Sequence, residues 1–187
     1  MLVAPHSYEL APDRCAAPPL EIGAIFKEHH SFVWRVLGHM GVAPGEQEDA
    51  MQEVFVVVHR RLAEYRDQDK MRAWLYAICS RIARDYRRRL FRRREQLSDT
   101  LPDTPLAASQ VADVSNRQAL EVAKGWLQSL PKKQREVFLL YEVEQMPMAE
   151  VAVAVGCPLP TAYARLKKAR ERLLAQVARA RFRGEAP

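Results

Sequence analysis

The chain has 187 residues, enough for one large domain or two small ones, and its 48% hydrophobic content excludes global disorder. Its formal net charge is +6, and cations gather in two runs, 81–94 and 165–183, which favours an anionic partner such as nucleic acid over a merely solvated helix face. The three cysteines lack CxxC spacing, and no apolar run reaches signal-peptide or membrane-spanning length. We therefore expect a cytoplasmic protein that does not insert into a membrane and has no disulfide framework.

The first half of the chain shows three helical stripes. Residues 1–19 are rich in proline and predict a disordered N-terminal extension. Apolar side chains then recur at three- and four-residue steps over 22–40, over 51–65 after a Gly/Pro break at 41–45, and over 71–90. These stripes predict a helical bundle that spans residues 20–95.

Composition changes after this bundle. Residues 96–116 are rich in Ser, Thr, Asp and Pro without a strong stripe, which is typical of a flexible linker. Helical spacing resumes over 117–182, with Pro131 at a tolerated helix start, and 183–187 form a short tail. The predicted fold class is all-α, with two small helical domains joined by the linker.

The sharpest local motif is the stretch MAEVAVAVGCPLPTAYARLKKAR, residues 148–170. A short apolar helix is followed by Gly156, a residue suited to a left-handed helix end, and then by a basic amphipathic helix. These are the parts of a helix-turn-helix whose second helix can enter the DNA major groove, although an ordinary helical hairpin is the plainer alternative. The residues expected at DNA, from the first turns and the basic face of that helix, are Pro160, Thr161, Tyr163, Ala164, Arg165, Lys167, Lys168 and Arg170.

Two segments together resemble a known family. The stretch 127–173 looks like region 4, and the stretches EDAMQEVFVVVHRRLAEY (48–65) and WLYAICSRIARDYRRR (74–89) look like region 2, of an extracytoplasmic-function (ECF) sigma factor of the sigma-70 type. The resemblance covers residues 20–180 in the family's order. It implies a protein that binds core RNA polymerase and directs transcription initiation by reading −10 and −35 promoter elements, under the control of an anti-sigma factor.

The resemblance also implies roles for residues of the first domain. The DxxQEVF stretch of the family docks on the largest polymerase subunit, and it matches the residues Asp49, Gln52, Glu53 and Phe55, beside which stands Glu48. Balancing nearby arginines is the alternative role for the acidic members. The loop 65–73 and the helix after it match the part that melts the −10 element and captures a base, which needs aromatic side chains and cations. The matching residues are Tyr65, Arg72, Trp74, Tyr76, Arg81, Arg84 and Arg88. Core packing is the stronger alternative for Trp74.

Three positions depart from the family pattern. Arg81 stands where the family usually has Asn, Pro160 replaces a common Gly, and Tyr163 replaces a frequent cation. An Asn can hydrogen-bond a base edge, whereas Arg favours guanine or phosphate. At position 81 two alternatives therefore stay open, a −10 preference different from the usual one or a contact with the DNA backbone alone. The changes at 160 and 163 leave the −35 sequence open and do not affect the fold.

Two other classes of function compete with this one. A dimeric helix-turn-helix repressor would bind a palindrome alone, but it leaves the acidic DAMQEVF helix unexplained. An enzyme such as a small nuclease is disfavoured because the five histidines form no HExxH pattern and no GxSxG or phosphate-binding loop is present. We expect no catalytic residue, metal, cofactor or small-molecule substrate.

Overall fold

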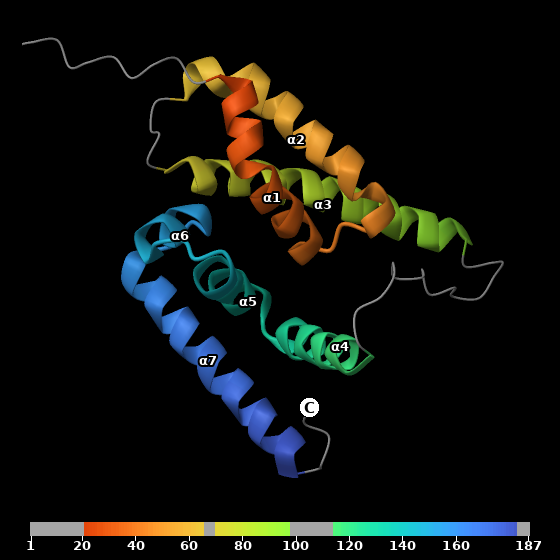
Figure 1. The fold of residues 1–187 in the computed structure, drawn as a ribbon, viewed down its shortest axis with the longest axis vertical. Helices are drawn as coiled ribbons and strands as arrows, with labels where there is room; N and C mark the ends of the chain where they lie inside the picture. Colours follow the sequence, from red (N-terminus) through yellow and green to blue (C-terminus); the bar gives the residue numbers. More distant parts are fainter. Residues whose placement is uncertain (1–20, 66–69, 98–113, 183–187) are drawn as a thin grey trace, which may run out of the picture.

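The computed structural model describes residues 21–65, 70–97 and 114–182, and every regular element in these ranges is helical. The all-α prediction is therefore confirmed. Figure 1 shows two units, an upper one built from α1–α3 and a lower one built from α4–α7. We call them the N-terminal unit and the C-terminal unit. In the described ranges, no helix is both long enough and apolar enough to cross a membrane.

The N-terminal unit packs three long helices, α1 (Ile22–His39), α2 (Gln47–Arg61) and α3 (Met71–Leu97). The first predicted stripe is confirmed at Ile25, Val33, Val36 and Leu37, which are buried on the inner side of α1, whereas Phe26 is 44% exposed. The chain then turns at Gly41, whose φ of +83° lies in the left-handed region that glycine tolerates best. The Val42 amide bonds to the Leu37 carbonyl across this turn at 3.1 Å, which closes the helix end.

The C-terminal unit contains α4 (Val114–Ser129), α5 (Lys132–Phe138), α6 (Met148–Ala154) and α7 (Leu159–Phe182). Pro131 directly precedes α5, as expected for a residue without a backbone N–H. A π-helical turn, Leu139–Val143, extends α5. Gly156 has a φ of +62° between α6 and α7, so the predicted left-handed helix end and the helix-turn-helix are both present.

Two details differ from the sequence-based expectations. Helices run slightly into both ends of the expected linker, because α3 extends to Leu97 and α4 begins at Val114. Leu174 of the basic amphipathic helix is 69% exposed, since α7 continues beyond the helices that cover its first half. The expected extension 1–19, the middle of the linker and the tail 183–187 lie outside the described residues.

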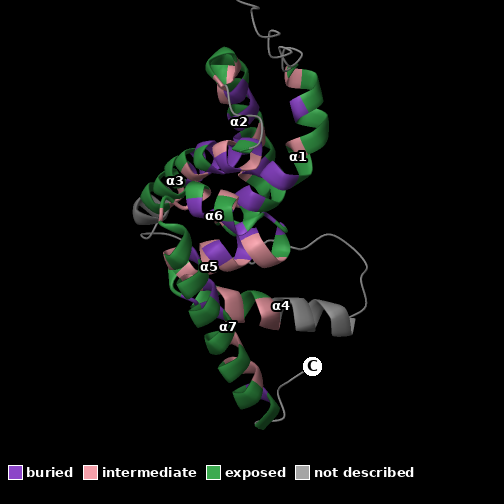
Figure 2. Cartoon of the chain, turned by 90° about the vertical axis from the view of Figure 1, so that its left-hand side faces the viewer, coloured by how far each residue is buried: buried purple, intermediate pink, exposed green. Residues whose placement is uncertain are grey.

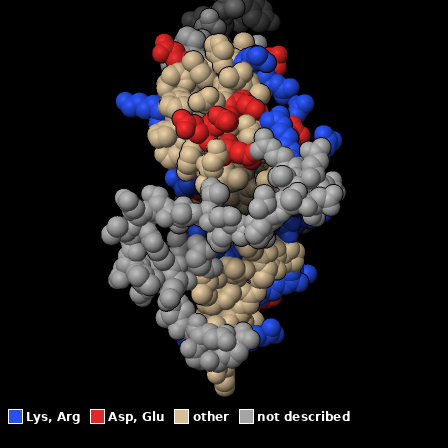
Figure 3. Space-filling model, turned by 90° about the vertical axis from the view of Figure 1, so that its right-hand side faces the viewer, with Lys and Arg blue, Asp and Glu red and all other residues tan. Residues whose placement is uncertain are grey.

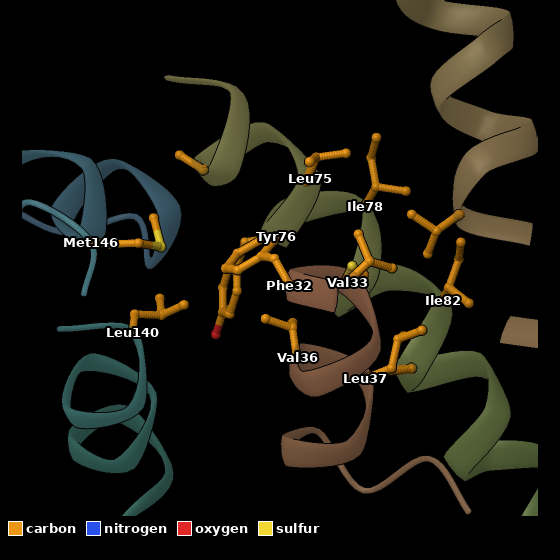
Figure 4. Packing of buried hydrophobic residues seen from close by; sticks show 14 of the residues in the cluster. Phe32, Val33, Val36, Leu37, Leu75, Tyr76, Ile78, Ile82, Leu140 and Met146 are labelled. Carbon is orange, nitrogen blue, oxygen red and sulfur yellow. The ribbon is translucent and has the colours of Figure 1, made fainter. Parts of the chain in front are cut away.

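The two units share one hydrophobic core. α3 packs against α6, and a single cluster of buried side chains runs from α1 through α3 into α5 and α6. Figure 2 shows this buried band crossing the junction, while the outer faces of the helices are exposed. In Figure 4, Leu140 and Met146 of the C-terminal unit face Tyr76 and Val36 of the N-terminal unit. The sequence predicted two tethered modules and gave no sign of this docking.

Candidate functional surfaces

The outer face of α2 is acidic and amide-rich, as predicted. Ala50, Val54 and Val58 turn inward and are buried. The helical period therefore leaves the four polar members of the predicted polymerase-binding set exposed, and these are Glu48, Asp49, Gln52 and Glu53. α2 begins on the right-hand side of Figure 1, and Figure 3, the view of that side, shows acidic side chains gathered on the N-terminal unit.

Within this acidic set, Glu53 has partners on the neighbouring helix. Its carboxylate accepts a hydrogen bond from the Tyr86 hydroxyl at 3.0 Å, and an Arg89 guanidinium nitrogen lies 3.7 Å away. Burial, followed by this hydrogen bond, raises the pKa of Tyr86 to about 12. Glu48 and Asp49 make no ion pair with any other residue that the structure describes, so the balancing role considered for these acids applies to Glu53 alone.

Phe55 differs from the other members of the polymerase-binding set because its side chain is buried. Its ring meets Phe26 of α1 edge to face, with the ring centroids 4.8 Å apart. Aromatic pairs of this geometry contribute about 0.5–1.5 kcal/mol beyond the area they bury. Phe55 therefore holds α2 against α1, and it shapes the surface from beneath.

The predicted −10 residues divide between two sides of α3. Positions 74, 81 and 88 share one side of the helix, with 84 at its edge, while positions 72 and 76 lie opposite. On the first side, the Trp74 ring stacks on Tyr65 with centroids 4.4 Å apart, and Arg81, Arg84 and Arg88 are exposed. This half-buried stack combines the core packing expected of Trp74 with an accessible aromatic edge.

A groove between α2 and α3 runs beside Trp74 and Arg81. Arg60 and Arg61, from the last turn of α2, also line it. A groove with cations around an aromatic stack has the chemistry that single-stranded nucleic acid requires. Arg60 and Arg61 were not among the predicted −10 residues, although a basic pair at the end of the DAMQEVF helix is visible in the sequence.

The opposite side of α3 faces the C-terminal unit. Arg72 donates from its guanidinium to the Glu144 carbonyl at 2.7 Å, and the guanidinium lies 4.6 Å from the centroid of the Phe32 ring. Tyr76 is buried, and this burial raises the pKa of its hydroxyl. The structure therefore does not bring Arg72 and Tyr76 together with Trp74 and Arg81.

The predicted −35 residues occupy the start of α7. Ala162, Leu166 and Ala169 are buried and fix the inner side of the helix. Of the predicted set, Thr161 and Arg165 are half-buried, and the exposed members are Pro160, Tyr163, Ala164, Lys167, Lys168 and Arg170. The start of α7 therefore presents an apolar and aromatic edge followed by a lysine pair.

Arg170 is the one exposed member of this set with an acidic partner in the described chain. Its guanidinium binds the Glu142 carboxylate through Nε at 2.7 Å and Nη2 at 2.5 Å. The same group lies 5.9 Å from the Tyr141 ring centroid. Arg170 thus braces α7 against the π-helical turn, whereas Lys167 and Lys168 remain unpaired among the described residues.

A charged cluster that was not predicted lies at the junction of the units. The Glu144 carboxylate, which is fully buried, accepts two hydrogen bonds from Arg35, at 2.9 and 2.7 Å. His39 approaches the same carboxylate to 3.8 Å and Arg72 to 3.6 Å. The hydrogen bond with Glu144 raises the pKa of Arg35, and burial lowers the pKa of His39.

No group of three or more His, Cys, Asp or Glu in the described ranges could hold a metal ion.

Comparison with known proteins agrees with this architecture. The family profile "Sigma-70 region 2" matches residues 25–94, and the profile "Sigma-70, region 4" matches residues 126–173. The "ECF RNA polymerase sigma factor SigC" of Mycobacterium tuberculosis is 26% identical over 152 residues, covering 81% of this chain and 80% of that protein. The "ECF RNA polymerase sigma-E factor" of Escherichia coli is 25% identical over 139 residues, covering 70% of this chain and 73% of that protein.

Solved structures share the fold. The complex of CnrH with the cytosolic domain of CnrY gives a TM-score of 0.61 at 22% identity, covering 84% of this chain and 87% of that one. The complex of RpoE with the anti-sigma factor NepR from Bartonella quintana gives a TM-score of 0.59 at 17% identity, covering 81% of this chain and 92% of that one.

Two helical units, one matched by region 2 and the other by region 4, define a sigma-70-type sigma factor, a non-enzymatic subunit of RNA polymerase that directs transcription initiation. Within that class, this chain belongs to the ECF subfamily.

Proposed function

We propose that the outer face of α2 is the surface by which this sigma factor docks on core RNA polymerase. The exposure of Glu48, Asp49 and Gln52, with their carboxylate and amide groups unengaged by described arginines, supports this role. Such a face suits a basic partner, because unpaired surface carboxylates steer and orient an oppositely charged surface. Glu53 joins this face to α3 through Tyr86, so the docked helix also positions the basic helix.

The N-terminal unit reads and melts the −10 element in this proposal. Support comes from the groove lined by Trp74 and by Arg60, Arg61 and Arg81, with Asp85 as its one acidic member, and from the stacking of Trp74 on Tyr65. An extruded base stacks on an aromatic ring, and the displaced strand's phosphates pair with the arginines. Arg84 and Arg88 continue the cationic side of α3 toward the adjoining duplex.

The C-terminal unit reads the −35 element through the start of α7. Pro160, Thr161, Tyr163 and Ala164 lie in the first turns, where a recognition helix meets base edges, and Lys167 and Lys168 follow. Lysines contact phosphates as point charges, and uncharged residues in the first turns contact base edges.

The proposed division assigns 20–95 to polymerase docking and the −10 element, 96–116 to the linker, and 117–182 to the −35 element. A 21-residue linker spans at most roughly 70 Å, which equals about 20 base pairs of duplex, so both elements of one promoter are within reach. The protein acts in the cytoplasm, where polymerase and promoter are found. An anti-sigma factor restrains it, as the structures of sigma factors with anti-sigma partners suggest for proteins of this fold.

Run-off transcription tests this function. Core polymerase lacking its own sigma factor is mixed with the purified chain on genomic fragments, and start sites are mapped. The proposal expects discrete start sites that require both proteins. Tight binding to a palindrome by the chain alone, without selection of start sites, would instead identify the repressor considered above.

Two double variants assign the surfaces. Asp49→Asn with Gln52→Ala should weaken binding to core polymerase about tenfold or more, because central polar contacts each contribute on the order of 1 kcal/mol. Lys167→Ala with Lys168→Ala should leave polymerase binding intact and flatten the salt dependence of holoenzyme–promoter binding by about 2 log units per log unit of salt. Glu28→Gln on α1 and Arg179→Ala with Arg181→Ala at the far end of α7 are matched controls. An unchanged affinity or slope in a test variant would remove that surface from the proposal.

A further inference from the structure

The side of the N-terminal unit that faces the C-terminal unit presents three basic side chains to one carboxylate. Arg35 and His39 come from the last turns of α1, and Arg72 comes from the start of α3. Their three side chains converge on one carboxylate, that of Glu144. Figure 1 shows the last turns of α1 reaching toward the C-terminal unit beside α3, which brings the three basic groups together.

Glu144 binds there in the manner of a ligand. Arg35 uses Nε and Nη2 to hold the two carboxylate oxygens separately, at 2.9 and 2.7 Å. This paired geometry is the one by which a guanidinium recognises either a carboxylate or a phosphate. The Glu144 side chain is fully buried, whereas Arg35 is 48% exposed, so the acid enters a site whose basic members keep access to solvent.

The backbone around Glu144 is unusual. It follows the π-helical turn, with its amide bonded to the Leu139 carbonyl at 2.9 Å, and it precedes Gln145, whose φ of +54° is rare for a residue with a side chain. π-helical turns and left-handed non-glycine residues concentrate at functional positions. Glu144 lies between these two features, and its side chain contacts Arg35, His39 and Arg72 of the other unit.

A second acid of the C-terminal unit strengthens the docking. Glu150 of α6 accepts a hydrogen bond from the Ala73 amide at 3.1 Å, and so caps the start of α3 beside Arg72. The first amides of a helix have no partner within it, and a side-chain acceptor satisfies them. Both acids thus occupy donors that belong to the N-terminal unit.

We infer that Arg35, Arg72 and His39 form a site for a phosphate of the promoter DNA backbone, which Glu144 fills while the two units are docked. The inference rests on the proposed function, because Arg72 belongs to the proposed promoter surface, and it adds Arg35 and His39 to that surface. When the units separate, the carboxylate leaves and the same guanidinium geometry receives a phosphate. Docking of the units and DNA binding at this site therefore exclude one another.

The test compares DNA affinities of the free full-length chain, by fluorescence anisotropy with a labelled 20-nucleotide single-stranded oligonucleotide at low salt. Glu144→Ala vacates the site and should bind about tenfold more tightly than wild type. The salt slope should steepen by roughly 0.7, because one more phosphate of the single strand is neutralised. Glu28→Ala removes the same charge from an exposed position of α1 and serves as the control.

Three results decide the matter. Adding Arg35→Ala to the Glu144→Ala chain should return the affinity to about the wild-type value, which a general loosening of the fold would not do. An equal gain in Glu28→Ala would show a net-charge effect and overturn the inference, as would no gain in a Glu144→Ala chain of native helicity. If Glu144→Ala does not fold, Glu144→Gln takes its place under the same criteria. Failure of wild-type run-off transcription removes the proposed function, whereas these affinities address the phosphate site alone.

Discussion

The two units differ in how they fill their cores. The N-terminal unit buries aromatic rings, among them Phe32, Phe55 and Tyr86, between three long helices. The described part of the C-terminal unit buries no aromatic ring, and four of its buried residues are the small side chains Ala152, Ala162, Ala169 and Ala180. Leu140 and Met146 of this unit complete their packing against the N-terminal unit. The N-terminal unit thus supplies the buried aromatic rings of the shared core, whereas the described part of the C-terminal unit supplies aliphatic side chains and methionines.

The largest expected difference concerns core leucines. Leu75 of α3 is 0% exposed and Leu166 of α7 is 3% exposed. Leu75→Ala should lower the free energy of unfolding by about 4 kcal/mol, near the upper part of the usual range, because three packed helices cannot collapse onto the cavity. Leu166→Ala should cost about 2 kcal/mol, since its smaller neighbours can close in. Urea denaturation followed by circular dichroism measures both, and equal losses would show that the two cores are equally filled.

Two ion pairs, one at the junction of the units and one on the N-terminal unit, differ in burial. Arg35 pairs with a fully buried carboxylate, whereas Arg89 pairs with Glu53 at a position where both side chains are about half exposed. Arg35→Ala should cost about 2 kcal/mol of unfolding free energy, because Glu144 keeps only its weaker partners. Arg89→Ala should cost about 0.5 kcal/mol or less. The same urea titrations apply, and an Arg35→Ala chain as stable as Arg89→Ala would mean that Glu144 is hydrated.

Two glycines of the C-terminal unit should respond with opposite signs. Gly156 has a φ of +62°, so Gly156→Ala should destabilise the chain by about 1 kcal/mol, although an added Cβ meets no atom within 4 Å. Gly125 lies within α4, is exposed, and also has open space around it. Gly125→Ala should stabilise the chain by about 0.5–1 kcal/mol. Thermal denaturation should show melting temperatures that move in opposite directions, and a shared direction would contradict the left-handed turn.

The two described cysteine thiols differ in burial. Cys79 of the N-terminal unit is 0% exposed, and burial raises its pKa from 9.0 to about 12, whereas Cys157 of the C-terminal unit is half-buried. At pH 8 a thiol reagent should modify Cys157 and leave Cys79 unmodified. Peptide mass spectrometry would show which cysteine carries the reagent. Burial of the neutral Cys79 thiol contributes fully to stability below pH 9, and this contribution is lost as the pH rises from 9 toward 12. Modification of both thiols at equal rates would mean that the N-terminal unit opens readily.

Much of the fold follows from local sequence patterns. The stripe of α1, the break at Gly41 and the left-handed Gly156 were all predictable, because helical spacing and glycine conformation depend on near neighbours. The acidic face of α2 followed from the same period once its apolar residues were assigned to the core. The linker between the two units was predicted from a change in composition alone. Its middle, residues 98–113, lies outside the described residues.

The side on which a residue works was less predictable. Arg72 and Trp74 are two positions apart and were predicted to share a task, yet the helical period places them on opposite sides of α3. Phe55 matched a docking motif but is buried against Phe26. A motif match gives each residue a candidate role, whereas burial decides which of these side chains is available for it.

What the sequence determined by itself is the set of helices, their apolar faces and the family to which their motifs belong, because each depends on spacing within one segment. The tertiary structure alone decided that Glu144 meets Arg35, 109 positions away, and that it does so without exposure to water. A single sequence records that an acid and a base are both present. Only the packing of α1 and α3 against the C-terminal unit determines that Glu144 and Arg35 meet. The same packing sets the free energy needed to separate them, because burial sets the strength of their attraction.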